Sequence, residues 1–131
     1  MAGYTIVNLK EVEDQAPKVG YSPDLVEARF ARVPLGLENA GLSYVRLGPN
    51  FRTPFGHKHR EQEEVYVLVG GSARMKLDDE VIELKAWDAV RVPPETVRGP
   101  EAVPEGAEYI AFGAPNTANR DAEPAPNWWT D

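Results

Sequence analysis

The sequence predicts an all-β protein, built as a small sandwich or closed barrel. Twelve prolines and eleven glycines interrupt the 131-residue chain at short intervals. The segments between them are short and rich in Val, Tyr, Ile and Leu, which favour strands over helices. Their close spacing is typical of β-sandwiches and barrels. One domain fits this length, and a chain of this size can bury a core without disulfide bonds.

Eight segments carry strand patterns: 5–9, 28–33, 42–47, 64–69, 73–77, 81–84, 89–92 and 109–112. The acidic residues 78–80 separate two alternating runs, so they predict the turn of a hairpin. Residues 35–40 could form one helical turn that ends at Gly41.

The sequence after Gly113 differs from the rest, because Ala, Pro and Asn dominate it. We therefore expect a single domain over residues 1–131, with a barrel core at about 28–113 and a short irregular tail at 114–131. The tail contains Trp128 and Trp129, and large exposed apolar side chains are unfavourable unless something covers them. We expect both to fold back onto their own domain, with a contact between subunits as the alternative.

Composition excludes several classes of function. Fourteen basic and 21 acidic residues leave a net charge of −7, and no basic stripe is present, which argues against a nucleic-acid partner. The absence of cysteine excludes thiolate metal sites and cysteine nucleophiles. No phosphate-binding glycine loop or dinucleotide motif predicts a nucleotide cofactor. With no apolar run long enough for a signal sequence or membrane span, we expect a cytoplasmic protein without a membrane partner.

The only two histidines of the chain, His57 and His59, stand two residues apart. On a strand such residues share a face, so their imidazoles point the same way. Glu64 begins the next strand segment and can place a carboxylate beside them, with Tyr66 on the same face. Two histidines and one carboxylate suit Fe(II), Mn(II), Ni(II) or Zn(II) and leave coordination positions open. The alternative is an exposed polar strand edge without a ligand.

The stretch from Gly56 to Gly71 resembles the first signature of the cupin family, which reads H-x-H, three or four residues, Glu, six residues, Gly. His57, His59, Glu64 and Gly71 fit the four-residue spacer. The resemblance implies that the first three are metal ligands.

The shorter spacer would instead use Glu63 with Gly70, but Glu64 is preferred because Gly71 then falls where cupins turn into their next strand. The resemblance spans residues 42–113. It implies an antiparallel jelly-roll barrel with its site inside, and a homodimer.

The second cupin signature is only partly present. Pro93 matches it, whereas Trp87 and Glu95 replace its glycines and Arg98 replaces the histidine that would be a fourth ligand. Arginine stays protonated and has no free lone pair, so it cannot bind a metal. Arg98 could repel the metal, hold an anionic ligand in bidentate fashion, or pair with Glu64 or Glu95.

Three further arginines, Arg46, Arg52 and Arg91, lie on or near strands that should border the same cavity. Together with Arg98 they would make the cavity of an acidic protein locally positive and favour an anionic small molecule. Surface ion pairs are the alternative for each of them. Tyr66 could donate a proton at the site, or it could simply pack.

Two hypotheses for function follow. The first is a metal-dependent cupin, an isomerase, decarboxylase or dioxygenase if it is an enzyme, that holds the metal through His57, His59 and Glu64 and an anionic ligand near Arg98, Tyr66, Arg46 and Arg52. The second is a metal-free, non-catalytic barrel that binds a small ligand or acts as a sensor, with Arg98 as its main contact. A barrel retained only for assembly is a third possibility.

Overall fold

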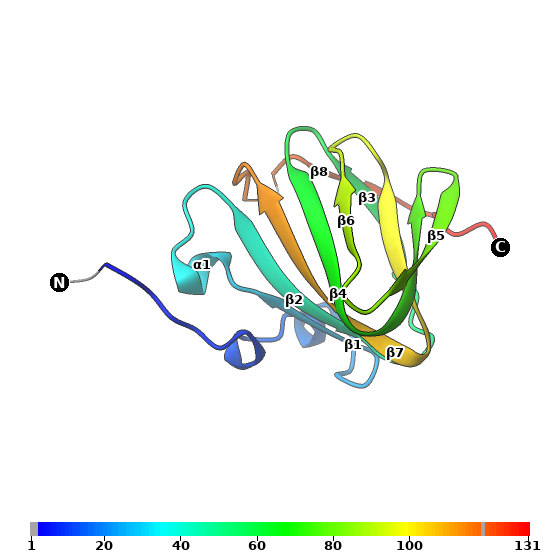
Figure 1. Cartoon of the computed structure of the whole chain (residues 1–131), viewed down its shortest axis with the longest axis horizontal. Coiled ribbons are helices and arrows are strands. Elements are labelled where there is room, and N and C mark those ends of the chain that lie inside the picture. Colours follow the sequence, from blue (N-terminus) through cyan, green and yellow to red (C-terminus); the bar gives the residue numbers. More distant parts are fainter. Residues whose placement is uncertain (1–2, 119) are drawn as a thin grey trace.

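Antiparallel strands dominate the structure, a computed structural model that describes residues 3–118 and 120–131 (Figure 1). The strands are β1 (Val26–Phe30), β2 (Gly41–Leu47), β3 (Gly56–His59), β4 (Glu63–Leu77), β5 (Glu80–Lys85), β6 (Ala89–Val92), β7 (Arg98–Ala114) and β8 (Ala122–Ala125). The helices are the 3-10 turns η1 (Leu9–Glu11) and η2 (Ala16–Val19), and α1 (Arg32–Leu35). No helix among the described residues is long and apolar enough to cross a membrane.

The long strands β4 and β7 pair with each other and curl the sheet into a half-barrel (Figure 1). Around them the sheet runs in the order β1-β2-β7-β3-β8, while β5 and β6 pair with opposite halves of β4. This arrangement agrees with the predicted antiparallel jelly-roll barrel. It also brings β3, which carries the two histidines, beside the start of β7.

The segments 64–69 and 73–77, predicted as two strands, are one bent strand. The register of β4 against β7 shifts between Leu68 and Gly70 and again between Gly71 and Ala73. Gly71 has φ +71°, and a Cβ built there would lie 2.1 Å from the backbone oxygen of Gly106. Glycine therefore permits a bulge that bends the strand without ending it.

The hydrophobic core lies inside the curled sheet. One cluster consists of Ala16, Val26, Val45, Leu47, Leu68, Ala73, Ala102 and Ala107, and a second of Tyr66, Met75, Val92 and Ala111. Because Ala16 and Val26 belong to the first cluster, the core begins before the predicted range of 28–113. The second cluster packs directly beneath the candidate site through Tyr66.

Several local predictions were wrong. Residues 5–9 form no strand, and Ile6 in this segment is 83% exposed, because no described strand lies beside it. The helical turn is Arg32–Leu35 rather than 35–40, and it ends at Gly36, whose φ of 71° gives a left-handed cap. Gly41 instead begins β2. The hairpin is correct, since Asp78 and Asp79 connect β4 to β5.

The tail is not wholly irregular, because β8 pairs with β3 along its length. Both tail tryptophans lie against the same chain, as expected. The Trp128 ring lies over Gly56 and Gly99, and the ammonium of Lys76 sits 4.3 Å from its centre. Trp129 donates its indole N–H to the backbone oxygen of Thr53, and the Arg52 guanidinium stacks on its ring.

Candidate metal centre

The structure brings His57, His59 and Glu64 together, with one ligand atom of each within 4.8 Å of the others. His57 and His59 project from β3, with ring centres 5.0 Å apart, and Glu64 projects from β4. Their Nε2 atoms lie 3.5 Å and 3.4 Å from Glu64 Oε1. Two ligand atoms about 2.1 Å from one metal ion lie about 3.0–3.4 Å apart at angles of about 90–110°. The spacing therefore fits a shared ion after a small contraction.

His59 is prepared to act as a ligand by Asp121. Its ring is buried, and Nδ1 donates to Asp121 Oδ1 across 3.1 Å, which leaves the lone pair on Nε2. That Nε2 is buried and has no hydrogen-bond partner in the described structure. A buried polar atom without a partner is costly, and a bound cation would satisfy it.

Asp121 is itself held in place. Its carboxylate accepts hydrogen bonds from the Thr117 hydroxyl and from the backbone N–H groups of Glu61 and Gln62. Burial opposes its ionisation, but these bonds and the one from His59 keep the pKa of Asp121 well below its usual range. The result is a fixed anion that accepts from the far nitrogen of the histidine ring, as carboxylates behind histidine ligands do in metal sites.

Glu64 is ionised in this environment. Burial raises the pKa of its carboxyl, but the facing imidazoles of His57 and His59 and the hydrogen bond from Tyr66 outweigh burial and lower it well below its usual range. The Tyr66 hydroxyl donates to Glu64 Oε1 across 2.7 Å. Burial, followed by the charge of Glu64, raises the pKa of Tyr66, so this phenol stays protonated.

Arg98 is buried next to the three residues of the cluster. It stands opposite His57 in the β3–β7 register, and its Nη1 is 3.7 Å from Glu64 Oε1. Nη2 donates to the backbone oxygen of Pro93, whereas Nε and Nη1 have no hydrogen-bond partner in the described structure. Although Arg98 belongs to the wall of a cavity, its side chain is 0% exposed. An external ligand reaches this guanidinium only if the atoms that cover it move.

A large, mostly apolar cavity of about 550 Å³ borders the cluster on the side of His57. Its size is typical of small-molecule sites. The aromatic residues of its wall are Tyr21, Phe30, Phe51, Phe55, Tyr66 and Tyr109.

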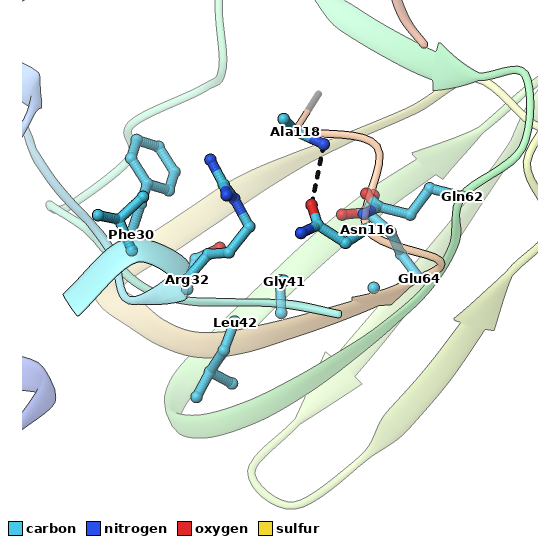
Figure 2. Close-up of a pocket in the computed structure, with 12 residues that line it drawn as sticks. Phe30, Arg32, Gly41, Leu42, Gln62, Glu64, Asn116 and Ala118 are labelled. Carbon is cyan, nitrogen blue, oxygen red and sulfur yellow. Dashed lines mark hydrogen bonds between the residues drawn. The ribbon is translucent and has the colours of Figure 1, made fainter. Parts of the chain in front are cut away.

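A smaller hollow of about 220 Å³ borders the cluster on the side of Glu64 (Figure 2). Its wall includes Arg32, Ser43 and Gln62, and it shares Phe30 with the larger cavity. The cluster thus lies between a polar hollow and an apolar one.

The structure does not bring the other predicted arginines to this site. Arg46 pairs with Glu27, and Arg91 pairs with Glu63. Arg52 pairs with Glu101 beside the tail. Neither hollow is lined by any of these three arginines. Each is satisfied by a nearby carboxylate, which the charge excess of an acidic protein makes common.

Glu63 points away from the cluster toward Arg91, so the four-residue spacer with Glu64 is the version that the fold uses. Sequence reasoning missed Asp121 and Arg32. Asp121 lies 62 residues after His59, and no spacing rule connects them. Arg32 was assigned to a strand, which concealed its place at the rim of the polar hollow.

Solved structures share this architecture. A cupin protein (BF4112) from Bacteroides fragilis matches with a TM-score of 0.70 and 22% identity over 90% of this chain and 89% of its own. The chain adopts the cupin fold. KdgF from Halomonas matches this cupin barrel at TM-score 0.69 and 18% identity over 90% of the chain and 98% of that protein. A variant of the oxalate decarboxylase of B. subtilis gives TM-score 0.74 and 18% identity over 94% of this cupin barrel, but only 33% of the decarboxylase is covered.

Sequence comparison adds little to the likeness in fold. No family model matches the chain. An uncharacterised protein of Methanocaldococcus jannaschii, MJ1618, is 42% identical over 40 residues. That match spans 30% of this cupin chain and 32% of the relative.

Proposed function

We propose that this cupin barrel binds one divalent metal ion, Mn, Fe, Ni or Zn, through His57, His59 and Glu64 and places an anionic small molecule beside it. The observation that supports the metal is the buried, unpartnered Nε2 of His59, which Asp121 fixes in the tautomer that a metal requires. The ionised Glu64 and the accessible His57 complete an N, N, O set.

The charge of the site supports the anionic ligand. With a divalent ion bound, the ion and Arg98 together with the carboxylates of Glu64 and Asp121 would leave a net charge of about +1. Arg98 acts here through its field and not by contact, because its side chain is buried. The field of a buried charge is weakly screened, so it attracts an anion to the open side of the cluster.

A divalent ion in this site would supply Lewis-acid polarisation of a ligand oxygen. The chain's own residues supply orientation and proton control. Tyr66 stays protonated and directs its hydroxyl to Glu64, which holds the carboxylate on the side of the histidines. The apolar cavity borders one side of the cluster with few polar groups. Isomerisation, decarboxylation and oxygenation are the reaction types that such a site permits.

The test is metal content after reconstitution with each of Mn, Fe(II), Ni and Zn. We expect close to one equivalent of at least one metal in the native chain and a large loss in Glu64→Gln and His59→Ala. Glu63→Gln is the matched control, because Glu63 is the neighbouring carboxylate and faces Arg91 instead. Content well below one equivalent for all four metals would overturn the proposal, and so would equal losses in the two glutamine variants.

Arg98 gives reason for a second candidate, a metal-free barrel that binds a small anion. A cation whose Nη1 lies 3.7 Å from a metal-ligand oxygen weakens metal binding by repulsion. In this reading Arg98→Met abolishes ligand binding, whereas alanine at both His57 and His59 leaves it unchanged. In the metal reading the double alanine variant loses the metal, and Arg98→Met retains or strengthens metal binding because the repulsive charge is gone.

A further inference from the structure

Arg32 is an arginine without a counter-ion at the rim of the polar hollow. Its side chain is half-buried, and within residues 3–118 and 120–131 it forms neither an ion pair nor a side-chain hydrogen bond. Other arginines of the chain do contact carboxylates, namely Arg29, Arg46, Arg52, Arg74 and Arg91. In a chain with 21 acidic residues, a guanidinium left without an acid is available to an external anion.

The setting of Arg32 suits a carboxylate. Figure 2 shows the side chain reaching between Phe30 and Asn116, with Glu64 and Gln62 on the opposite side of the hollow. The planar guanidinium can donate two parallel hydrogen bonds to one carboxylate. The Asn116 amide is uncharged and partly engaged, since Nδ2 donates one N–H to the backbone oxygen of Glu38 and Oδ1 accepts from the N–H of Ala118. Arg32 is therefore the cation that this hollow offers.

The larger cavity suits an apolar group. Its wall is mostly aromatic and aliphatic, and it reaches the cluster through His57 and Tyr66. A sugar or a short dicarboxylate would leave its polar groups without partners against such a wall, which is unfavourable. An aromatic ring would instead bury its surface against side chains such as Phe51 and Tyr109.

Phe30 joins the two hollows. It is the residue that lines both, and it is 49% exposed. A molecule that extends from Arg32 past Phe30 into the cavity therefore passes the cluster, where Glu64 borders the first hollow and His57 the second.

We infer that the ligand of this site is a small monocarboxylate with an apolar, aromatic body, whose carboxylate binds Arg32 and whose body fills the cavity beside His57. This inference names the ligand class for the proposed function and rests on it for the identity of the site. It assigns the specificity for the anion to Arg32, and not to Arg98, Arg46 or Arg52.

The experiment uses 4-fluorophenylacetate as the probe and 19F NMR titration as the readout, on the full chain both before and after metal loading. Binding of its uncharged counterpart, 4-fluorophenylacetamide, measures how much the ligand's charge contributes to affinity. Competition by glycolate, a carboxylate without an aromatic ring, measures how much the apolar body contributes. Arg32→Gln removes the cation, Arg32→Lys retains it, and Arg46→Gln is the control at an arginine that pairs elsewhere. Circular dichroism of each variant verifies that the fold is retained.

We expect the carboxylate to bind, the amide to bind at least about tenfold more weakly, and glycolate to compete poorly, since a hydrogen bond to a charged group is roughly twice as strong as one between neutral groups. Arg32→Gln should reproduce the loss of about tenfold for the carboxylate. Arg32→Lys should lose less, because it keeps the charge but not the two parallel hydrogen bonds, and Arg46→Gln should bind nearly as the native chain does. Equal binding of carboxylate and amide, an unaffected Arg32→Gln variant, or no binding of the probe would each overturn the inference. Binding in the metal-free chain with no metal uptake would instead refute the proposed metal function alone.

Discussion

At the scale of single residues, one carboxylate oxygen is the common neighbour of the groups that surround the candidate metal centre. Glu64 Oε1 accepts a hydrogen bond from Tyr66 and lies 3.5 Å from His57 Nε2, 3.4 Å from His59 Nε2 and 3.7 Å from Arg98 Nη1. Four positive or hydrogen-bonding groups thus converge on one carboxylate. Loss of this carboxylate would leave Arg98 buried without its nearest anion, a situation that costs several kcal/mol in other proteins.

Asp121 gives a prediction at the same scale. In Asp121→Asn the side chain can still accept a hydrogen bond, but it no longer offers an anion to His59 Nδ1–H. We expect metal affinity to fall by about 10- to 100-fold, as it does when the hydrogen-bond partner of a histidine ligand is changed. Calorimetric titration of the metal-free chain measures this.

Asp88→Asn is the matched control, because Asp88 also accepts from a backbone N–H, that of Lys85, in a turn between β5 and β6. Equal metal affinity in Asp121→Asn and the native chain would show that Asp121 supports only the fold.

At the scale of elements, the bend in β4 decides the geometry of the site. The first half of β4 carries Glu64 and Tyr66 and pairs with β6, and the second half pairs with β5. The bulge around Gly71 lets one strand pair with β6 through its first half and with β5 through its second half. The carboxylate and the histidines of β3 therefore meet because β4 and β7 turn together.

Substitution at two neighbouring glycines tests this role. Gly71→Ala forces a positive φ on alanine and places Cβ against the backbone oxygen of Gly106, so we expect a loss of about 3 kcal/mol or more in the free energy of unfolding. Gly70→Ala meets the end of the Glu108 side chain, which can move, so its cost should be about 1 kcal/mol. Urea denaturation of both variants gives the comparison, and equal losses would contradict the proposed need for glycine at position 71.

At the scale of the whole molecule, ion pairs as well as the two tryptophans hold the residues after β8 against the barrel. Glu101 on β7 accepts from Arg52 and from Arg74, and both arginines also contact Asp131. The same two guanidinium groups lie 4.3 Å and 6.0 Å from the centre of the Trp129 ring. This cluster joins the C-terminal residues to β4 and β7.

The charge cluster makes stability depend on pH. Burial raises the pKa of Glu101, but the hydrogen bonds from Arg52 and Arg74 outweigh it and hold the pKa below the ordinary 4.5. A lowered carboxyl pKa stabilises the fold above pH 4.5, and this contribution is lost as pH falls through the folded-state value. We expect Glu101→Gln to melt about 3–5 °C below the native chain at pH 7, for a loss of about 1 kcal/mol, and the two melting temperatures to converge near pH 3.

Melting curves at pH 7, 5, 4 and 3 measure this effect. Glu80→Gln serves as the control, because Glu80 is exposed and forms no ion pair in the described structure. A constant gap between the native chain and Glu101→Gln across this range would refute the assignment to Glu101.

Short-range sequence patterns were sufficient to predict much of the fold and the metal-ligand cluster of this protein. Alternating apolar residues between glycines and prolines determined the all-β class and the hairpin at Asp78, because strand pairing and tight turns depend on neighbouring residues. The two-residue spacing of His57 and His59 determined that their rings share a face. The position of Glu64 at the start of the next strand then predicted the cluster.

Only the tertiary structure decided which long-range partners complete the site. Asp121 reaches His59 because β8 pairs with β3, and Arg98 lies beneath Glu64 because β7 pairs with both β3 and β4. The pairing of β1 with β2 places Arg46 opposite Glu27, and an isolated bridge places Arg52 opposite Glu101, while Arg32 lies at the hollow. Local sequence fixes the direction of a side chain along its strand, whereas the burial and the partners of a charge depend on which strands the curled sheet places next to each other.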